Sequence, residues 1–301
     1  MTPDPNDLWS QIFNFADYGQ LLVLLQNSII AGAVLGLVGG LIGVFVMARD
    51  MAFAVHGISE LSFAGAAAGL LFGIGVVEGS IIGSLVAAIL IGVLGAKAKD
   101  RNSIIAVLMP FGLGLGILFL TLYPGRAANK FGLLTGQIVA VDNPRLNSLI
   151  AISLVVVIGL LLVWRPLVFA SVDSDVASAR GVPVRWLSLY FMILLGLAVA
   201  VSVQVVGSLL VLAILVTPAA AALRVSRSPI LVPLLSMLFA VVSLVGGIML
   251  ALGGSIPISP YVTTISFLIY VVCRVLEASR KKRGLSGRNA SGLRRPVMAE
   301  A

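Results

Sequence analysis

The sequence predicts an all-α protein, a transmembrane bundle of about nine helices, and three observations lead to this prediction. The chain of 301 residues is 59% hydrophobic and only 11% charged, whereas soluble domains are about 45–50% apolar. Its apolar residues form continuous runs, several of them near the roughly 20 residues that a helix needs to cross the hydrocarbon core. These runs do not alternate between apolar and polar residues, as the strands of a membrane β-barrel do. The composition therefore excludes a soluble protein, and the pattern excludes a barrel.

Nine apolar runs are the candidate spans. In chain order they cover residues 20–48, 52–76, 80–96, 103–123, 147–164, 186–205, 208–223, 230–252 and 261–279. A turn at Gly207 separates the sixth span from the seventh, and the number of spans falls to eight if 186–223 folds differently. Thr217-Pro218 is expected to kink the seventh span, because proline lacks a backbone donor. The motif GLVGGLIG lies wholly inside the first span, where close packing of small residues explains it better than phosphate binding.

The basic residues predict the orientation of the chain, because cytoplasmic loops carry an excess of Lys and Arg. Eight of the 20 Lys and Arg lie near the end of the last span and in the C-terminal tail that follows it: Arg274, Arg280, Lys281, Lys282, Arg283, Arg288, Arg294 and Arg295. With this tail in the cytoplasm, nine more fall on the same side: Arg49, Lys97, Lys99, Arg101, Arg165, Arg180, Arg185, Arg224 and Arg227. Only Arg126, Lys130 and Arg145 remain outside. We therefore expect a multi-pass protein of a prokaryotic cell membrane with its N-terminus outside and its C-terminus in the cytoplasm.

The chain divides into three regions. Residues 1–19 are acidic and lack the basic start of a signal peptide, so they are expected to form an extracytoplasmic segment. Residues 20–279 form the transmembrane domain. Residues 280–301 form a basic cytoplasmic tail whose small and polar composition predicts disorder. A basic cluster directly after a span is typical of contact with anionic membrane lipid, not with nucleic acid. The single cysteine, Cys273, excludes an internal disulfide.

Two connections are too long to be simple turns. Residues 124–146 are external and are expected to include a short helix near a pore mouth. Residues 165–185 are cytoplasmic and contain the stretch VDSDVASAR. This stretch begins with an N-cap candidate, Asp173 or Ser174, and stops at Gly181, which are the start and stop signals of a short helix. A helix at this place is suited to receive another subunit; the alternative is a surface helix without a partner.

The second span holds the candidate site. Of the 12 acidic residues only Glu60 falls inside a span, and the only histidine, His56, lies four residues before it. This spacing places both side chains on one face of a helix, and imidazole and carboxylate are ligands that Zn²⁺ and Mn²⁺ accept. An ionisable group at this depth is costly and indicates function. The alternatives are that the two residues only bond each other, or that Glu60 is protonated in a packed interior.

Two ligands do not complete a coordination sphere, so the others must come from a symmetry-related copy, water or backbone carbonyls. Ser59 lies between the pair and could add a hydroxyl, although serine in a membrane helix usually bonds a carbonyl of its own helix. Gln204, deep in the sixth span, either joins two helices or lines the pathway.

Several chemistries are excluded by the inventory of residues. No GxxxxGK[ST] motif occurs, so the chain does not bind ATP through a P-loop. One histidine and one cysteine cannot build an HExxH or a CxxC site. We therefore expect no catalytic residues and no cofactor bound by this chain.

Three motifs in order resemble the permease subunits of zinc and manganese ABC importers, the family often called ABC-3, over about Leu21 to Arg274. The first is GLVGGLIGVFVMARDMAF followed by HGISELSFAGAAAG, the second is VDSDVASARGVPV, and the third is VVGSLLVLAILVTPAAAALR. The family usually has Asp, three residues, then His in the second span. This chain has His56 and Glu60, so the imidazole and the carboxylate have exchanged places, which predicts a retained metal site of altered geometry.

The resemblance implies a fold similar to type II ABC importer permeases and a homodimer around a central pathway. It implies that a separate ABC ATPase subunit docks on the cytoplasmic loop helix and that an extracytoplasmic binding protein delivers the metal. The coupling residues carried over in this way are Asp173, Asp175, Ala177, Ala179 and Gly181. Zinc is slightly favoured over manganese as the transported ion, because zinc is the commonest substrate in the family.

Three other functions remain to be compared with this one. A permease for chelated iron (siderophore) or cobalamin is the nearest alternative, and Glu60 argues against it because such pathways lack a charged ligand pair. An intramembrane enzyme would need a nucleophile and a base, or a fuller metal site. A scaffold without transport would leave the intramembrane carboxylate unexplained.

Overall fold

The computed structural model describes residues 19, 22, 24–95, 98–125, 141–208, 210–252 and 258–292, and the regular elements in these ranges are all α-helices, as predicted. In chain order they are α3 (Gln26–Ala48), α4 (Ala52–Phe72), α5 (Val76–Leu94), α6 (Ala98–Leu122), α8 (Asn143–Leu162), α9 (Trp164–Val172), α10 (Ser174–Ala179), α11 (Val184–Val206), α12 (Val211–Leu215), α13 (Thr217–Val225), α14 (Leu231–Ala251) and α15 (Ile258–Gly292).

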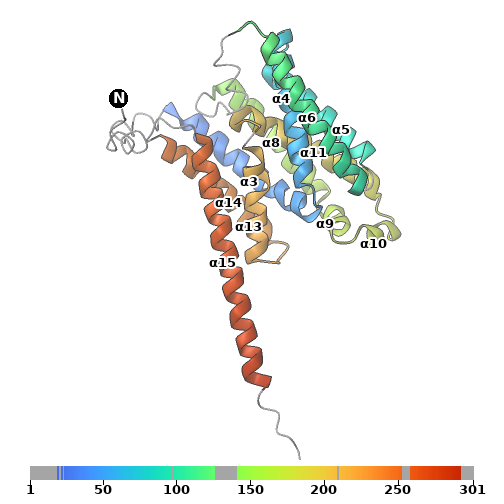
Figure 1. Cartoon of the computed structure of the whole chain (residues 1–301), viewed down its shortest axis with the longest axis vertical. Coiled ribbons are helices and arrows are strands. Elements are labelled where there is room, and N and C mark those ends of the chain that lie inside the picture. The colour runs from blue at the N-terminus through green and yellow to red at the C-terminus, as the bar shows by residue number, and fades with distance from the viewer. Residues whose placement is uncertain are drawn as a thin grey trace, which may run out of the picture.

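The helices pack in two groups. In Figure 1, α4, α5, α6 and α11 lie on one side of the bundle, whereas α13, α14 and α15 lie on the other with α3. Helix α8 contacts both α3 and α11 and so joins the two groups. The short helices α9 and α10 lie at the end of the bundle where α11 begins (Figure 1).

Within the described ranges, eight helices are long and apolar enough to cross a membrane. Eight predicted spans each coincide with one of them, but the seventh, 208–223, is wrong as a full-length helix. That stretch forms α12 and α13, which together cover Val211–Val225, only about 22 Å of helix. Gly207 leaves the helical conformation with a φ of 79°, and Pro218 has no N–H to continue the ladder of hydrogen bonds. The described part of the chain thus contains the eight full spans of the alternative prediction.

The interrupted segment nevertheless runs from one end of the bundle to the other. Where α11 ends, Gln204 Nε2 donates to the carbonyl oxygen of Val77 at the start of α5, 3.4 Å away. Where α13 ends, Arg224 Nη1 lies 3.4 Å from Glu277 Oε2 near the far end of the bundle. The start of α3 and the end of the span Ile258–Arg280 of α15 consequently lie at opposite ends of the bundle, as an odd number of crossings requires (Figure 1).

Glycines bring the longest helices into close contact. A Cβ atom added to Gly40 of α3 would lie 2.6 Å from the Met237 Cα of α14. Between α4 and α5, a Cβ on Gly65 would lie 2.2 Å from the carbonyl oxygen of Gly79, and the reverse distance is also 2.2 Å. Only glycine permits backbones this close. The GLVGGLIG motif therefore serves helix packing, as predicted.

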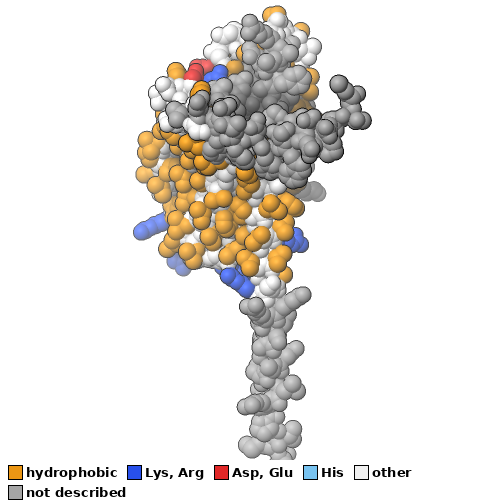
Figure 2. Space-filling view, turned by 90° about the vertical axis from the view of Figure 1, so that its left-hand side faces the viewer, with side chains coloured by type: hydrophobic (Ala, Val, Ile, Leu, Met, Phe, Trp, Pro, Cys, Tyr) orange, Lys and Arg blue, Asp and Glu red, His pale blue; other side chains and the backbone are white. Residues whose placement is uncertain are grey.

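The surface agrees with a membrane protein. Figure 2 shows a broad band of hydrophobic side chains with Lys and Arg along its lower edge. Large apolar side chains stay exposed on the long helices, among them Leu162 at 76% and Phe267 at 61%. Such a band, ended by basic residues, is suited to hydrocarbon bounded by lipid headgroups.

Three predictions concern parts of the chain at its ends and in its long external connection. The short helix predicted near the pore mouth lies mostly within residues 126–140, outside the described ranges. The N-terminal segment 1–18 is also outside them. The backbone of α15 remains helical to Gly292, beyond residue 280, where the tail was predicted to lose structure. A helix satisfies its own backbone hydrogen bonds and can continue without neighbours.

Candidate functional site

Helix α4 carries the predicted metal ligands and occupies a central place in its group. It follows α3 after a turn in which Asp50 has a φ of 52°. The Asp50 N–H donates to the Met47 carbonyl and the Met51 N–H to the Val46 carbonyl, the two hydrogen bonds of a Schellman motif. α4 packs against α5, α6, α11 and α12, so that most of its side chains are buried.

His56 and Glu60 lie on one face of α4, as predicted. Nδ1 of His56 is 3.8 Å from Oε1 of Glu60, and the two side chains are 27% and 6% exposed. This distance is longer than a hydrogen bond. Nδ1 of His56 and Oε2 of Glu60 are buried, and neither has a hydrogen-bond partner among the described residues. The pair does not satisfy its own polar atoms, which is costly for buried groups, and a divalent cation bound between them would use both.

The described residues contain no group of three or more His, Cys, Asp or Glu side chains that could hold a metal ion. His56 and Glu60 thus form an incomplete ligand set in a single chain. That further ligands come from a symmetry-related copy, water or backbone carbonyls stays a prediction.

The other two predicted pathway residues form local contacts. Ser59 Oγ donates to the carbonyl oxygen of His56 at 2.8 Å, a backbone bond within its own helix. Gln204 donates to the Val77 carbonyl and so links α11 to α5. The contact of Gln204 matches the first of its two predicted roles, joining helices.

Buried serines next to the site connect three helices, a feature that the sequence analysis missed. Ser62 Oγ and Ser80 Oγ lie 2.7 Å apart, and Ser80 Oγ is 3.3 Å from the carbonyl oxygen of Ala200, to which it donates. These contacts tie α4 to α5 and α11 within two residues of Glu60. Serine within apolar helices is a weak signal, and no spacing in the sequence identifies its partner.

The break between α12 and α13 lies against the glycines of α3 and beside α4. A Cβ on Gly43 would lie 1.9 Å from the carbonyl oxygen of Leu215, so this carbonyl points at the glycine. Ser266 Oγ donates to the Ala213 carbonyl at 3.1 Å. Ser208 Oγ, just after α11, is buried and has no partner among the described residues. The break thus leaves backbone and hydroxyl oxygens inside the bundle, where Pro218 interrupts the regular helix.

The predicted short helix of the cytoplasmic loop is present as α10. Asp173 is its N-cap, because its Oδ1 accepts hydrogen bonds from the N–H groups of Asp175 and Val176 at 3.0 and 2.9 Å. Gly181, with a φ of 84°, ends it through a second Schellman motif, in which the Val182 N–H donates to the Ala177 carbonyl at 3.0 Å.

The side chains of this helix separate into inner and outer ones. Ala177 is fully buried, whereas Asp175 and Ala179 are exposed. Val172, at the end of α9, is 83% exposed, and Val176 is 47% exposed. Val172 and Val176 are thus apolar side chains exposed among polar ones at the end of the bundle, and such side chains are suited to a protein partner.

Comparisons with known proteins identify relatives over most of this chain. Residues 22–277 match the model of the family described as the ABC 3 transport family. The manganese transport system membrane protein MntC of Halalkalibacterium halodurans is 31% identical over 226 residues, 74% of this chain and 77% of the relative. The manganese import system permease protein ScaB of Streptococcus parasanguinis is 27% identical, covering 90% of this chain and 97% of the relative.

Two solved structures share the fold. PsaBC from Streptococcus pneumoniae, in complex with Fab, superposes with a TM-score of 0.77 at 25% identity, over 86% of this chain and 95% of the other. A metal-chelate type ABC transporter in an inward-facing conformation gives a TM-score of 0.66 at 19% identity, over 87% and 92% of the two chains.

Proposed function

This chain belongs to the ABC 3 transport family, and from that premise we propose that it imports manganese into a prokaryotic cell. It is a multi-pass membrane permease of a metal ABC importer, not an enzyme, and ATP is hydrolysed on a separate ATPase chain. The slight preference for zinc finds no support among the relatives, since MntC and ScaB are both named for manganese. The alternative, a siderophore or cobalamin permease, is not supported either, because the metal-chelate type transporter shares only its fold with this chain.

The observation that carries the proposal is the pair of buried, unpartnered ligand atoms on α4. Carboxylate oxygens suit Mn²⁺, and imidazole is accepted by first-row divalent metals. The one thiol of the chain, Cys273, lies on α15, so the proposed ligands include no sulfur that would favour softer ions. The negative charge of Glu60 would offset part of the charge of a divalent cation in a medium of low dielectric constant.

The incomplete ligand set favours a homodimer. Two copies of α4 facing each other across a central pathway would supply two imidazoles and two carboxylates, and backbone carbonyls or water would fill the remaining positions of the coordination sphere. His56 then donates a nitrogen lone pair to the ion, and Glu60 holds the ion by charge. Ser62, bonded to α5, fixes the rotation of α4 that presents both side chains.

The partners follow from the same reading. The exposed side of α10 would receive the ATPase subunit, and an extracytoplasmic binding protein would deliver the ion at the opposite end. The basic residues gather at the α10 end of the bundle, which by the positive-inside rule lies in the cytoplasm, near anionic lipid.

Uptake of radioactive manganese tests this function, in cells that lack their own importer and express the chain with its ATPase and binding protein. Glu60→Gln keeps size and polarity but removes the charge, and we expect it to lose at least about 90% of uptake. His56→Ala should lose a similar share. An excess of unlabelled manganese should compete better than zinc. Normal uptake by Glu60→Gln, at matched expression, would show that the pair is structural and that the ion is selected elsewhere.

A double substitution separates a ligand role from a packing role. His56→Asp with Glu60→His restores the order of carboxylate and imidazole that is usual in the family. Partial recovery of uptake, relative to either single substitution, would support metal ligation. No recovery, in a protein that assembles normally, would favour a packing role of His56 and Glu60 over metal ligation.

A further inference from the structure

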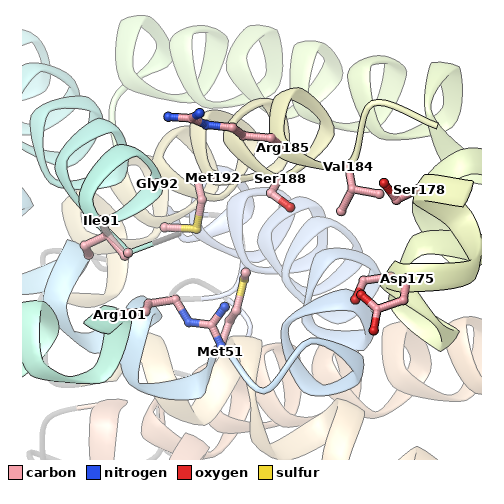
Figure 3. Close-up of a pocket in the computed structure, with 12 residues that line it drawn as sticks. Met51, Ile91, Gly92, Arg101, Asp175, Ser178, Val184, Arg185, Ser188 and Met192 are labelled. Atoms are coloured by element: carbon pink, nitrogen blue, oxygen red, sulfur yellow. The ribbon is translucent and has the colours of Figure 1, made fainter. Parts of the chain in front are cut away.

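A cavity of about 380 Å³ lies beside α10, away from the proposed metal site. Its walls come from α5, α6, α10, α11 and the turn between α3 and α4. Figure 3 shows Asp175 and Ser178 of α10 on one side of the cavity and Arg101 across from them, while Arg185 and Ser188 of α11 lie along its upper edge. The helix proposed to dock the ATPase thus has a polar hollow at its back.

The cavity borders the guanidinium groups of Arg49 and Arg101, which form no ion pair with a described residue. Arg49 Nη2 donates to Ser188 Oγ, and Arg101 Nη2 donates to the carbonyl oxygens of Arg49 and Asp50, each at 3.4 Å. Arg49 Nη1 and Arg101 Nε are buried and have no acceptor among the described residues. Burial, and secondly the charge of Arg101, lower the pKa of Arg49. The ring of Phe191, 5.5 Å from the Arg49 guanidinium, supplies only weak compensation.

The charges of the lining indicate the kind of group that fits. Arg101 and Arg185 contribute two positive charges and Asp175 one negative charge, so the lining carries a net charge of +1. A single carboxylate would balance this charge, and guanidinium and carboxylate groups form strong charge-assisted hydrogen bonds. Ser178 and Ser188 add hydroxyl groups to the same cavity.

The position of the cavity indicates where that carboxylate comes from. Ser174, Asp175 and Ser178 of α10 form part of its wall, and the exposed Val172 and Val176 lie on the same short segment. A protein that covers these valines would reach the cavity with a side chain that passes along α10. A lipid phosphate would enter from the membrane, and its binding would not require residues of α10 in the lining.

We propose that the cavity receives an acidic side chain of the ATPase subunit, which pairs with Arg101 and Arg185 when that subunit docks on α10. This inference rests on the proposed function, since it takes the partner to be the ATPase. It deepens that function by naming a contact behind the docking helix and the chemistry of the partner's group.

The contact would also reach the helix of the metal ligands. Arg101 holds the turn between α3 and α4 through the carbonyl oxygens of Arg49 and Asp50, and Met51, the N-cap of α4, lines the cavity. His56 lies five residues further, about 7.5 Å along the helix. A carboxylate that draws Arg101 into the cavity would act directly on the start of α4.

Charge reversal at Arg185 tests the proposal, because this side chain is exposed and no described residue pairs with it. The affinity of the purified permease for its ATPase is measured in nanodiscs. We expect Arg185→Glu to weaken binding about ten-fold or more and Arg185→Lys to retain most of it. Arg227→Glu, an equal charge change at an exposed position outside the cavity, should bind as the wild type does. A basic replacement of one acidic residue of the ATPase should restore binding to Arg185→Glu.

The other outcomes separate the two proposals. If the wild type imports manganese with its ATPase and Arg185→Glu binds that ATPase equally well, the cavity contact is refuted while the function stands. If the wild type neither binds an ATPase nor imports metal, the proposed function fails. If Arg185→Glu leaves ATPase affinity unchanged but abolishes binding of phosphatidylglycerol or inorganic phosphate to the permease alone, the occupant is a phosphate and the proposal is overturned. Should Arg185→Glu misfold, a weaker salt dependence of ATPase binding in Arg185→Gln gives the same decision.

Discussion

At the scale of single residues, the site depends on side chains whose ordinary partners are missing. His56 Nδ1 and Glu60 Oε1 are 3.8 Å apart, too far for a hydrogen bond, and each residue keeps a buried polar atom that has no partner in the described part of the chain. Arg101, which lines the cavity beside α10, and the neighbouring Arg49 likewise have buried nitrogens without an acceptor among the described residues. Because an unsatisfied buried polar atom destabilises the fold, its persistence is best explained by a ligand or a partner that supplies the missing contact.

Asp50 offers a test of backbone conformation in the turn that precedes α4. Its φ of 52° is a conformation that glycine adopts freely and β-branched residues avoid. We expect Asp50→Gly to raise stability by up to about 1 kcal/mol and Asp50→Val to lower it by about 1–2 kcal/mol, with Asp50→Ala between Gly and Val. Thermal unfolding in detergent measures the order. A valine variant as stable as the wild type would contradict the Schellman turn described here.

At the scale of elements, the helix ends shape the surface to which we propose that the ATPase subunit docks. The Schellman motifs at Asp50 and Gly181 end α3 and α10 on the same end of the bundle, so both turns border the cavity. α10 is short, has contacts mainly with α9, and has a hollow behind it. A short helix with few contacts can move as a unit when a partner binds, provided that the caps at its two ends keep it helical.

Gly181→Val tests the coupling role of α10. No atom lies within 4 Å of a Cβ at this position, so the substitution adds conformational strain without a clash. We expect it to displace α10, and therefore to abolish manganese uptake while the assembled ATPase continues to hydrolyse ATP.

Gly73→Val is the matched control. Gly73 also has a positive φ, 72°, and open space around its Cβ, but it ends α4 at the other end of the bundle. It should cost similar stability and leave ATP hydrolysis coupled to uptake. If both variants, or neither, uncouple the two activities, α10 is not the specific docking element.

At the scale of the whole molecule, the described ranges contain eight full spans and one interrupted crossing, an odd number of passages. The end of α13 and the end of the α15 bundle segment meet through Arg224 and Glu277, while the start of α3 lies near the start of α8, where Asn27 donates to Asn143 at 2.8 Å. The start of α3 and the part of α15 near Glu277 thus lie at opposite ends of the bundle. An interrupted seventh crossing is therefore enough to place the two ends of the helical bundle on opposite sides of the membrane.

Labelling with a membrane-impermeant thiol reagent tests this topology in whole cells. Arg227→Cys, between α13 and α14, should react only after permeabilisation, and Glu78→Cys, at the start of α5, should react in intact cells. The native Cys273 is only 4% exposed and serves as the background. Labelling of Arg227→Cys from outside would mean that α12 and α13 turn back and do not cross.

The sequence by itself determined the class of the fold, the positions of eight of the nine predicted spans, the short helix α10 and the shared face of His56 and Glu60 on α4. These features are local: hydrophobicity adds along a helix, Asp173 and Gly181 cap a helix from within a few residues, and a spacing of four places His56 and Glu60 on one face.

Only the tertiary structure decided how the segment 208–223 crosses, which serines join α4 to its neighbours, and that Arg101 meets the turn at Arg49. The reason is that these features are contacts between helices far apart in the chain. Gly43 leaves room for the carbonyl oxygen of Leu215 at the break between α12 and α13. The Ser80 hydroxyl donates to the carbonyl oxygen of Ala200, 120 residues further along the chain. The cost of a free carbonyl or a lone guanidinium depends on what packs against it, and packing between distant segments is settled only when the whole bundle has formed.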